Sequence, residues 1–144
     1  LDRAALRHVV FGNRTLLAAL NRIVHPPVAV ERARLLSEAE AAGTKILVED
    51  IPLLFEVMDP AKFDAVVLVD APLAARRERL ERTRGLDRAT AESMIAAQMP
   101  STEKRRRATF VIDNDGDLDR LEGKARDAWQ AILGGAAAQS RSRI

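Results

Sequence analysis

The sequence contains no cysteine and no tyrosine, and it has only four phenylalanines and one tryptophan among its 144 residues. The absence of cysteine excludes disulfide bonds and thiolate metal sites. With only His8 and His25, a histidine metal site is not expected either. No apolar run approaches the ~20 residues that span a bilayer, and no signal peptide is recognised at the start. We therefore expect a soluble cytoplasmic protein with no membrane partner.

The formal net charge of +2 hides an uneven distribution of arginine. Residues 76–107 hold ten basic residues, nine of them arginine, against five acidic ones. Arginine forks bind phosphate in a bidentate manner, so this block suits a phosphate-bearing partner. A merely solvated helix face is the alternative that charge alone leaves open. A nucleic-acid partner is not expected, because the block contains no aromatic residue to stack on bases.

Capping and helix-breaking residues predict three helices before Gly43, where the third helix is expected to stop. Asp2 caps the first, and a break at Gly12-Asn13 lets Asn13 cap the second. The stretch His25-Pro26-Pro27 is expected to end the second helix, because proline has no N–H and restricts the residue before it.

Three apolar runs that do not alternate with polar residues predict strands buried on both faces, as in a parallel sheet covered by helices. The runs are Ile46–Val48, Ala65–Val69 and Thr109–Ile112. Further helices are expected to begin near Pro72, Asp87, Pro100 and Asp117. The resulting fold class is α/β, with three layers (α/β/α) around the sheet, and the tail 134–144 is expected to be disordered.

Each expected strand ends on acidic residues, at the edge where parallel α/β sheets bind ligands. These residues are Glu49-Asp50, Asp70 and Asp113. An apolar run that ends on Asp50 is typical of a Walker B strand, whose aspartate helps to hold Mg²⁺. The alternative, which the following Pro52 favours, is that Asp50 caps the next helix. The stretch 113–116 is a turn signature whose backbone groups could read a purine edge.

Six motifs, taken in order and spacing, resemble the dephospho-CoA kinases. They are LDRAALR at 1–7, HP at 25–26, IPLLFE at 51–56, VLVDAP at 67–72, IAAQMP at 95–100, and FVIDN at 110–114 with Gly116. That family consists of P-loop kinases, related to the nucleoside monophosphate kinases, which use ATP and Mg²⁺ to phosphorylate the ribose 3′-hydroxyl of dephospho-CoA in the last step of coenzyme A synthesis. The resemblance implies a single partial P-loop kinase domain over 1–133, with a parallel sheet that lacks its N-terminal strands. Within it, residues 1–43 would be CoA-binding helices, 76–107 the lid, and 44–75 with 108–133 the core.

The resemblance also implies two sets of binding residues. Those on the dephospho-CoA side are His25, Pro26, Asp50, Pro52, Leu53, Leu54, Phe55 and Glu56, with the three apolar residues from Leu53 as a wall for the acceptor nucleoside. Those on the ATP and lid side are Arg82, Arg84, Gln98, Lys104, Arg105, Asn114 and Gly116. This chain departs from the family pattern at Thr83, where the family usually has arginine, and at Thr109, where it often has an acid.

The sequence contains no G-x-x-x-x-G-K-[ST] loop. The resemblance therefore places the P-loop lysine and the catalytic base upstream of Leu1, with no catalytic residue and no metal ligand in these 144 residues. Because positioning is most of phosphoryl-transfer chemistry, we expect the parent protein to be a kinase and this stretch alone to be close to inactive. With three strands where the family has five, we also expect an exposed sheet edge, and a monomer or weak oligomer. Another P-loop kinase for a nucleotide or sugar, or a non-catalytic nucleic-acid-binding module, remain as alternatives.

Overall fold

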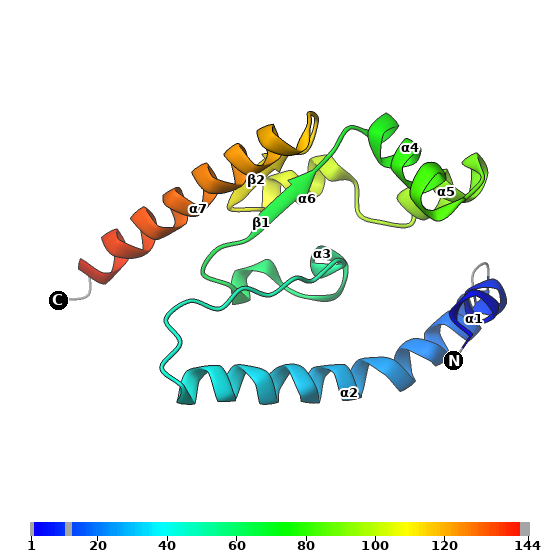
Figure 1. Cartoon of the computed structure of the whole chain (residues 1–144). Coiled ribbons are helices and arrows are strands. Elements are labelled where there is room, and N and C mark those ends of the chain that lie inside the picture. Colours follow the sequence, from blue (N-terminus) through cyan, green and yellow to red (C-terminus); the bar gives the residue numbers. More distant parts are fainter. Residues whose placement is uncertain (1, 11–12, 142–144) are drawn as a thin grey trace. The chain divides into compact units, whose positions relative to one another are not determined.

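The computed structural model describes residues 2–10 and 13–141, and Figure 1 follows its elements along the chain. They are α1 (Arg3–Val10), α2 (Arg14–Ala41), α3 (Leu54–Val57), a 3-10 turn (Pro60–Lys62), β1 (Val67–Asp70), α4 (Leu73–Arg84), α5 (Arg88–Ala96), α6 (Ser101–Arg107), β2 (Phe110–Asp113) and α7 (Leu118–Arg141). The chain divides into two compact units, residues 1–50 and 51–144, whereas the sequence favours one domain over 1–133.

The first unit consists of α1, α2 and an extended segment. Asp2 caps α1 by accepting from Ala5 N at 3.0 Å, and Asn13 caps α2 by accepting from Leu16 N at 3.1 Å, both as expected. Gly12, where a break between the first two helices is expected, lies outside the described residues. Helix α2 ends next to Gly43, whose left-handed φ of 69° suits a glycine at a helix C-terminus.

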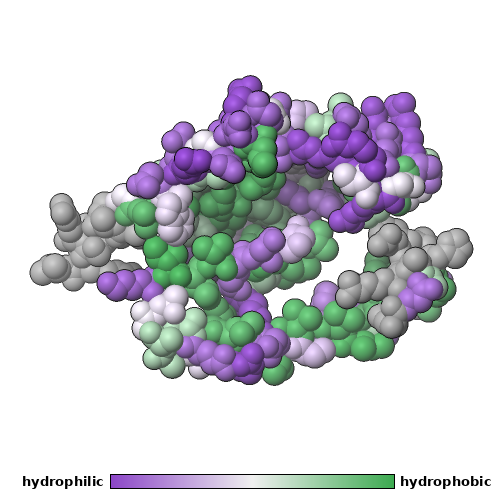
Figure 2. Space-filling model, in the orientation of Figure 1, coloured by the Kyte–Doolittle hydropathy of each residue, from purple (hydrophilic) through white to green (hydrophobic). Residues whose placement is uncertain are grey.

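The predicted break at His25-Pro26-Pro27 is wrong, because α2 runs through both prolines. Each proline removes one helical hydrogen bond, but its fixed φ is close to the helical value, so a helix can continue through the pair with a bend. Figure 1 shows α2 as one ribbon that bends along its length. Apolar residues of α2 remain at the surface in Figure 2, with Ile23 72% and Val30 71% exposed.

The strand predicted at Ile46–Val48 is also wrong, since this segment is extended but unpaired in the described structure. A strand needs a neighbour to satisfy its backbone N–H and C=O groups, and the described strands β1 and β2 pair with each other. Val48 is accordingly 78% exposed. The segment is held by a bidentate pair from α2, in which Arg32 Nε and Nη2 lie 2.5 and 2.8 Å from the Glu49 carboxylate.

The second unit contains the sheet, where the other two predicted strands form. The expectation that both faces are buried is wrong for β1, because Val67 is 39% and Val69 is 55% exposed. Strands β1 and β2 pair in parallel, and the register sets Asp70 opposite Asp113 at their carboxyl ends. Thr109 fixes the start of the pair, because its N–H donates to Val66 O at 2.8 Å and its hydroxyl accepts from Val66 N at 3.0 Å. Helix α6 contacts β1 and α7 contacts β2. The α/β class is thereby confirmed.

Helices α4 and α5 contact each other, and in the chain they lie after β1 and before β2. Gly85, with a φ of 61°, ends α4, and Asp87 caps α5 by accepting from Thr90 N at 2.9 Å. Helix α7 continues to Arg141, so residues 134–141, predicted to be disordered, are helical; their alanines favour that state. Residues 142–144 lie outside the described residues. No helix within 2–10 and 13–141 combines the length and the apolar content needed to cross a membrane.

Candidate functional site

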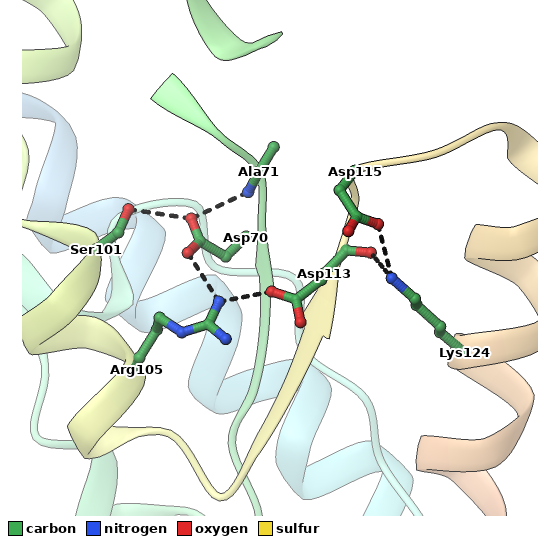
Figure 3. Close-up of polar contacts among 7 residues, drawn as sticks. All are labelled: Asp70, Ala71, Ser101, Arg105, Asp113, Asp115 and Lys124. Carbon is green, nitrogen blue, oxygen red and sulfur yellow. Dashed lines mark hydrogen bonds and ion pairs between the residues drawn. The ribbon is translucent and has the colours of Figure 1, made fainter. Parts of the chain in front are cut away.

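The carboxyl ends of β1 and β2 carry a linked set of charged side chains (Figure 3). Asp70 Oδ1 accepts from Ala71 N and from Ser101 Oγ, each at 3.0 Å. Arg105 Nη1 lies 3.1 Å from Asp70 Oδ2 and 2.7 Å from Asp113 Oδ1. A single guanidinium nitrogen from α6 therefore bridges the ends of both strands.

The charges at this edge stabilise one another. Hydrogen bonds to Asp113 and then to Asp70 raise the pKa of Arg105, and the Arg105 guanidinium lowers the pKa of Asp113. Lys124 of α7 adds a second cation, whose Nζ lies 2.7 Å from both Asp113 O and Asp115 Oδ1 and lowers the pKa of Asp115. The carboxylates of Asp113 and Asp115 are thus ionised and paired at neutral pH.

A cavity of about 270 Å³ opens at the same edge. Its lining residues are Asp70, Ala71, Pro72, Leu73, Arg76, Ser101, Arg105, Asp113 and Asp115. The Nε of Arg76 is buried there and has no hydrogen-bond partner among the described residues. A buried guanidinium N–H without a partner is costly, so the Arg76 side chain is incompletely satisfied in this conformation.

A second polar cluster joins α3 to α6. Lys104, only 7% exposed, places Nζ 2.8 Å from Glu56 Oε1 and 3.2 Å from Gln98 Oε1. Met99 N donates to the same Glu56 oxygen at 2.9 Å. Burial is the largest single influence on the pKa of Glu56 and raises it, but the hydrogen bonds from Lys104 and Met99 together outweigh burial and lower that pKa.

Phe55, the neighbour of Glu56, points inward and is 9% exposed. The guanidinium carbon of Arg107 lies 5.9 Å from the centre of its ring, and Arg107 Nη1 is 3.5 Å from Phe55 O. Of the three residues expected to form an apolar wall, Phe55 is buried, Leu53 is 45% exposed and Leu54 is half-buried.

The remaining expected substrate residues lie in exposed positions. His25 and Pro26 are exposed in the middle of α2, and Asp50 is exposed at the end of the first unit. Pro52 is exposed in the turn before α3. The structure thus brings Glu56 together with Lys104 and Gln98, and it describes His25 and Pro26 in a separate unit.

The expected lid and nucleotide residues lie in three places: the end of α4, the region of α6 described above for Gln98, Lys104 and Arg105, and the turn after β2. Arg82 and Arg84 are exposed in the last turn of α4, beside Thr83, whose hydroxyl donates to Arg79 O at 2.6 Å. Arg79 in turn donates from Nη2 to Asn114 Oδ1 at 3.0 Å and approaches Asn114 O at 3.3 Å. This bond ties α4 to the turn that follows β2.

Gly116 in this turn is exposed, and a Cβ there would lie 3.1 Å from Arg120 Cδ. Because that atom belongs to a flexible side chain, a larger residue at 116 would displace Arg120 rather than the backbone.

Sequence reasoning assigned no role to Ser101 or Lys124, and it noted Arg79 and Arg107 only as members of the arginine-rich block 76–107. A signal existed for Ser101, because it stands four residues before Arg105 and so shares its helix face. The spacing of Lys104 and Arg107 likewise places them on one face of α6. No comparable pattern marks Arg79 or Lys124, which reach their partners across the fold.

Among the described residues, no group of three or more acidic or histidine side chains could hold a metal ion. The acids at the strand ends are already bound to Arg105, Ser101 and Lys124, so a cation would have to displace those donors. These side chains therefore do not fit a resident Mg²⁺ site.

Parallel strands that end in charged residues beside arginine-rich helices define the class: a mixed α/β fold that corresponds to part of a P-loop kinase. The sequence profile described as dephospho-CoA kinase matches residues 1–120. The chain belongs to the dephospho-CoA kinase family.

Individual relatives agree with this assignment. A dephospho-CoA kinase of Deinococcus radiodurans is 47% identical over 132 residues, which cover 92% of this chain and 64% of that protein. One of Frankia casuarinae is 41% identical over 133 residues, covering 92% of this chain and 57% of that protein. The chain thus spans about three fifths of the length of these curated relatives.

Solved structures share the fold. A Thermus thermophilus protein of known crystal structure superposes with a TM-score of 0.71 at 41% identity, covering 92% of this chain and 68% of its own. The dephospho-CoA kinase of Campylobacter jejuni superposes with a TM-score of 0.62 at 23% identity, covering 94% of this chain and 67% of its own; at that identity the likeness concerns the fold alone.

Proposed function

We propose that the protein acts as a dephospho-CoA kinase, which transfers the γ-phosphoryl group of ATP to the ribose 3′-hydroxyl of dephospho-CoA in the final step of coenzyme A biosynthesis. The observation that carries this proposal is the family match over residues 1–120, with relatives up to 47% identical. The arginine-lined edge of the sheet supports it, because guanidinium groups suit the phosphates of both substrates.

In this reaction the 3′-oxygen bonds to the γ-phosphorus, the bond to the β-phosphate oxygen breaks, and ADP leaves. Arg105 and the exposed Arg82 and Arg84 would neutralise charge on the transferring group, with the last two taking the place of an arginine at Thr83. Asn114, held by Arg79, and Gly116 would lie near the adenine of ATP.

The acceptor would lie against exposed residues that precede the lid. His25, Pro26 and Asp50 would contact dephospho-CoA, and Pro52 with Leu53 and Leu54 would form the apolar part of its nucleoside site. Mg²⁺ would arrive as the magnesium complex of ATP, since that ion keeps several waters and binds chiefly to substrate phosphates in such enzymes.

The 144 residues hold neither a G-x-x-x-x-G-K-[ST] loop nor a residue to which we assign the role of base. We propose that these residues alone phosphorylate dephospho-CoA at least ~100-fold more slowly than a complete kinase of this family does. Most of the rate gained by holding the two reactants together is lost when the γ-phosphate of ATP is not oriented.

The test is to incubate the full-length protein that carries this chain with ATP, Mg²⁺ and either dephospho-CoA or a series of nucleoside monophosphates. We expect coenzyme A and ADP in equal amounts, with the new phosphate at the 3′ position by ³¹P NMR. Turnover of nucleoside monophosphates but not of dephospho-CoA would contradict the proposal. So would salt-sensitive binding of generic duplex DNA without turnover, which is the behaviour of a nucleic-acid-binding module. The 144-residue chain, assayed in parallel, tests the expected slow turnover.

A further inference from the structure

We propose that Glu56 is a positioning residue: it clamps the hinge at Met99 and the adjoining helix α6, and thereby sets where Arg105 stands at the sheet edge. This inference rests on the proposed function for its kinetic consequence, but its structural part can be tested without catalysis. We call the contacts of Glu56 with Lys104 and Met99 the hinge clamp.

The hinge lies where the α4–α5 pair rejoins the sheet. The chain enters the pair after β1, at residues 71–72, and leaves it through residues 97–100 before α6. Lid motions are absorbed at a few residues that end helices or strands, and 97–100 is such a segment. Glu56 Oε1 fixes it through the backbone N–H of Met99 at 2.9 Å, so the carboxylate restrains one of the two places where the pair could swing.

Helix α6 carries the effect from the clamp to the sheet edge. On one face Lys104 and Arg107, three residues apart, contact Glu56 and Phe55 of α3. On another face Ser101 and Arg105, four residues apart, contact Asp70, and Arg105 also contacts Asp113. Because α6 has only seven residues, a rotation that frees the first face must also move the second.

Burial of Lys104 makes loss of the clamp costly. Lys104 is 7% exposed, whereas Glu56 is an exposed residue whose side chain is one fifth exposed. Removing the Glu56 carboxylate leaves the Lys104 ammonium buried without an opposite charge, which is destabilising. The neighbouring pair of Glu103 and Arg106 offers the contrast, since its side chains are 39% and 76% exposed and join α6 only to itself.

The first readout is amide hydrogen exchange, for which we compare wild type with Glu56→Gln, Lys104→Met, Lys104→Arg and the control Glu103→Gln. In Lys104→Met and Glu56→Gln we expect the peptide containing Met99 to exchange at least about tenfold faster, with β1 and β2 unchanged. Lys104→Arg should stay close to wild type, because a guanidinium can still reach Glu56. Unchanged protection at Met99 in both clamp variants, or loss of protection in the control as well, would overturn the clamp.

The second readout is the split between kcat and KM in the full-length protein. Lys104→Met should lower kcat by about tenfold or more and leave the KM for dephospho-CoA within about twofold. The reason is that a displaced Arg105 guanidinium would stabilise the transition state less well. Lys104→Arg should restore kcat. A Lys104→Met enzyme with a lower melting temperature but a wild-type kcat would reduce the pair to a structural role and refute the inference. A wild-type enzyme inactive on dephospho-CoA would refute the proposed function instead, and hydrogen exchange would still decide the clamp.

Discussion

Substitution of Phe55 gives different results for a substrate-binding role and for a core role. The first affects the KM for dephospho-CoA, and the second affects the free energy of unfolding. The ring of Phe55 is 9% exposed and lies under Arg107, so Phe55→Ala should mainly destabilise the second unit. Truncating a buried phenylalanine costs about 3–5 kcal/mol, and the low end applies here because few side chains in this unit are fully enclosed. For a unit of this size about 3 kcal/mol corresponds to a fall in melting temperature of roughly 12 °C or more.

The assay is urea unfolding followed by the fluorescence of Trp129, which is the single tryptophan and lies in the same unit. Leu53→Ala is the matched control, because Leu53 is 45% exposed and should cost less than about 1 kcal/mol. In the full-length kinase the pattern should reverse, with Leu53→Ala raising the KM for dephospho-CoA more than Phe55→Leu does. If Phe55→Ala costs no more than Leu53→Ala, the ring is not a core residue and the reasoning fails.

Three further predictions concern backbone strain, pH and the bridging arginine. Gly85→Ala should destabilise the protein by about 1 kcal/mol because the φ of 61° is left-handed, while Gly123→Ala in the exposed interior of α7 should stabilise it by about 0.5–1 kcal/mol; urea midpoints test both. The pKa of Glu56 is lowered from 4.5, so the Glu56 carboxylate contributes fully to the free energy of unfolding above pH 4.5. That contribution is lost as the pH falls through the pKa that Glu56 has in the folded protein. In Glu56→Gln the free energy of unfolding should therefore decline less steeply in that acidic range. Arg105→Lys should change stability by less than about 1 kcal/mol because the side chain is 40% exposed, yet lower kcat in the full-length enzyme; an unchanged kcat would remove Arg105 from the phosphate site.

Local chemistry predicted the second unit well. The continuous apolar runs before Asp70 and Asp113 were identified as parallel strands, and β1 and β2 are parallel. The cap at Asp87 was predictable because a side-chain oxygen and a backbone N–H three residues later are all that such a cap requires, and Asn13 in the first unit was predicted for the same reason.

The errors arose where a local pattern depends on something distant. The run at Ile46–Val48 has strand composition, but a strand exists only with a partner, and the sequence of the run says nothing about that partner. The pair Pro26-Pro27 has the composition of a helix break, yet the turns on either side continue one helix. In both places the outcome depends on hydrogen bonds made by other residues.

The resemblance named candidate site residues but not their contacts. It proposed Lys104, Gln98 and Arg105 for the ATP and lid side, but nothing in the sequence pairs Lys104 with Glu56 across the intervening residues. The opposition of Asp70 and Asp113 follows from the register of two strands, which only the folded pair defines. The contacts at the sheet edge and at the hinge therefore had to come from the structure.

The pairing of Val66 with Thr109 closes a loop whose ends are 43 residues apart. The entropy cost of closing such a loop rises only slowly, by about 0.6 kcal/mol for each doubling of its length. Insertions or deletions between α4 and α5 would therefore leave the sheet intact as long as α6 keeps its two sets of contacts. The length of the helical excursion can therefore change without disturbing the sheet, whereas the seven residues of α6 that follow it hold contacts on two sides.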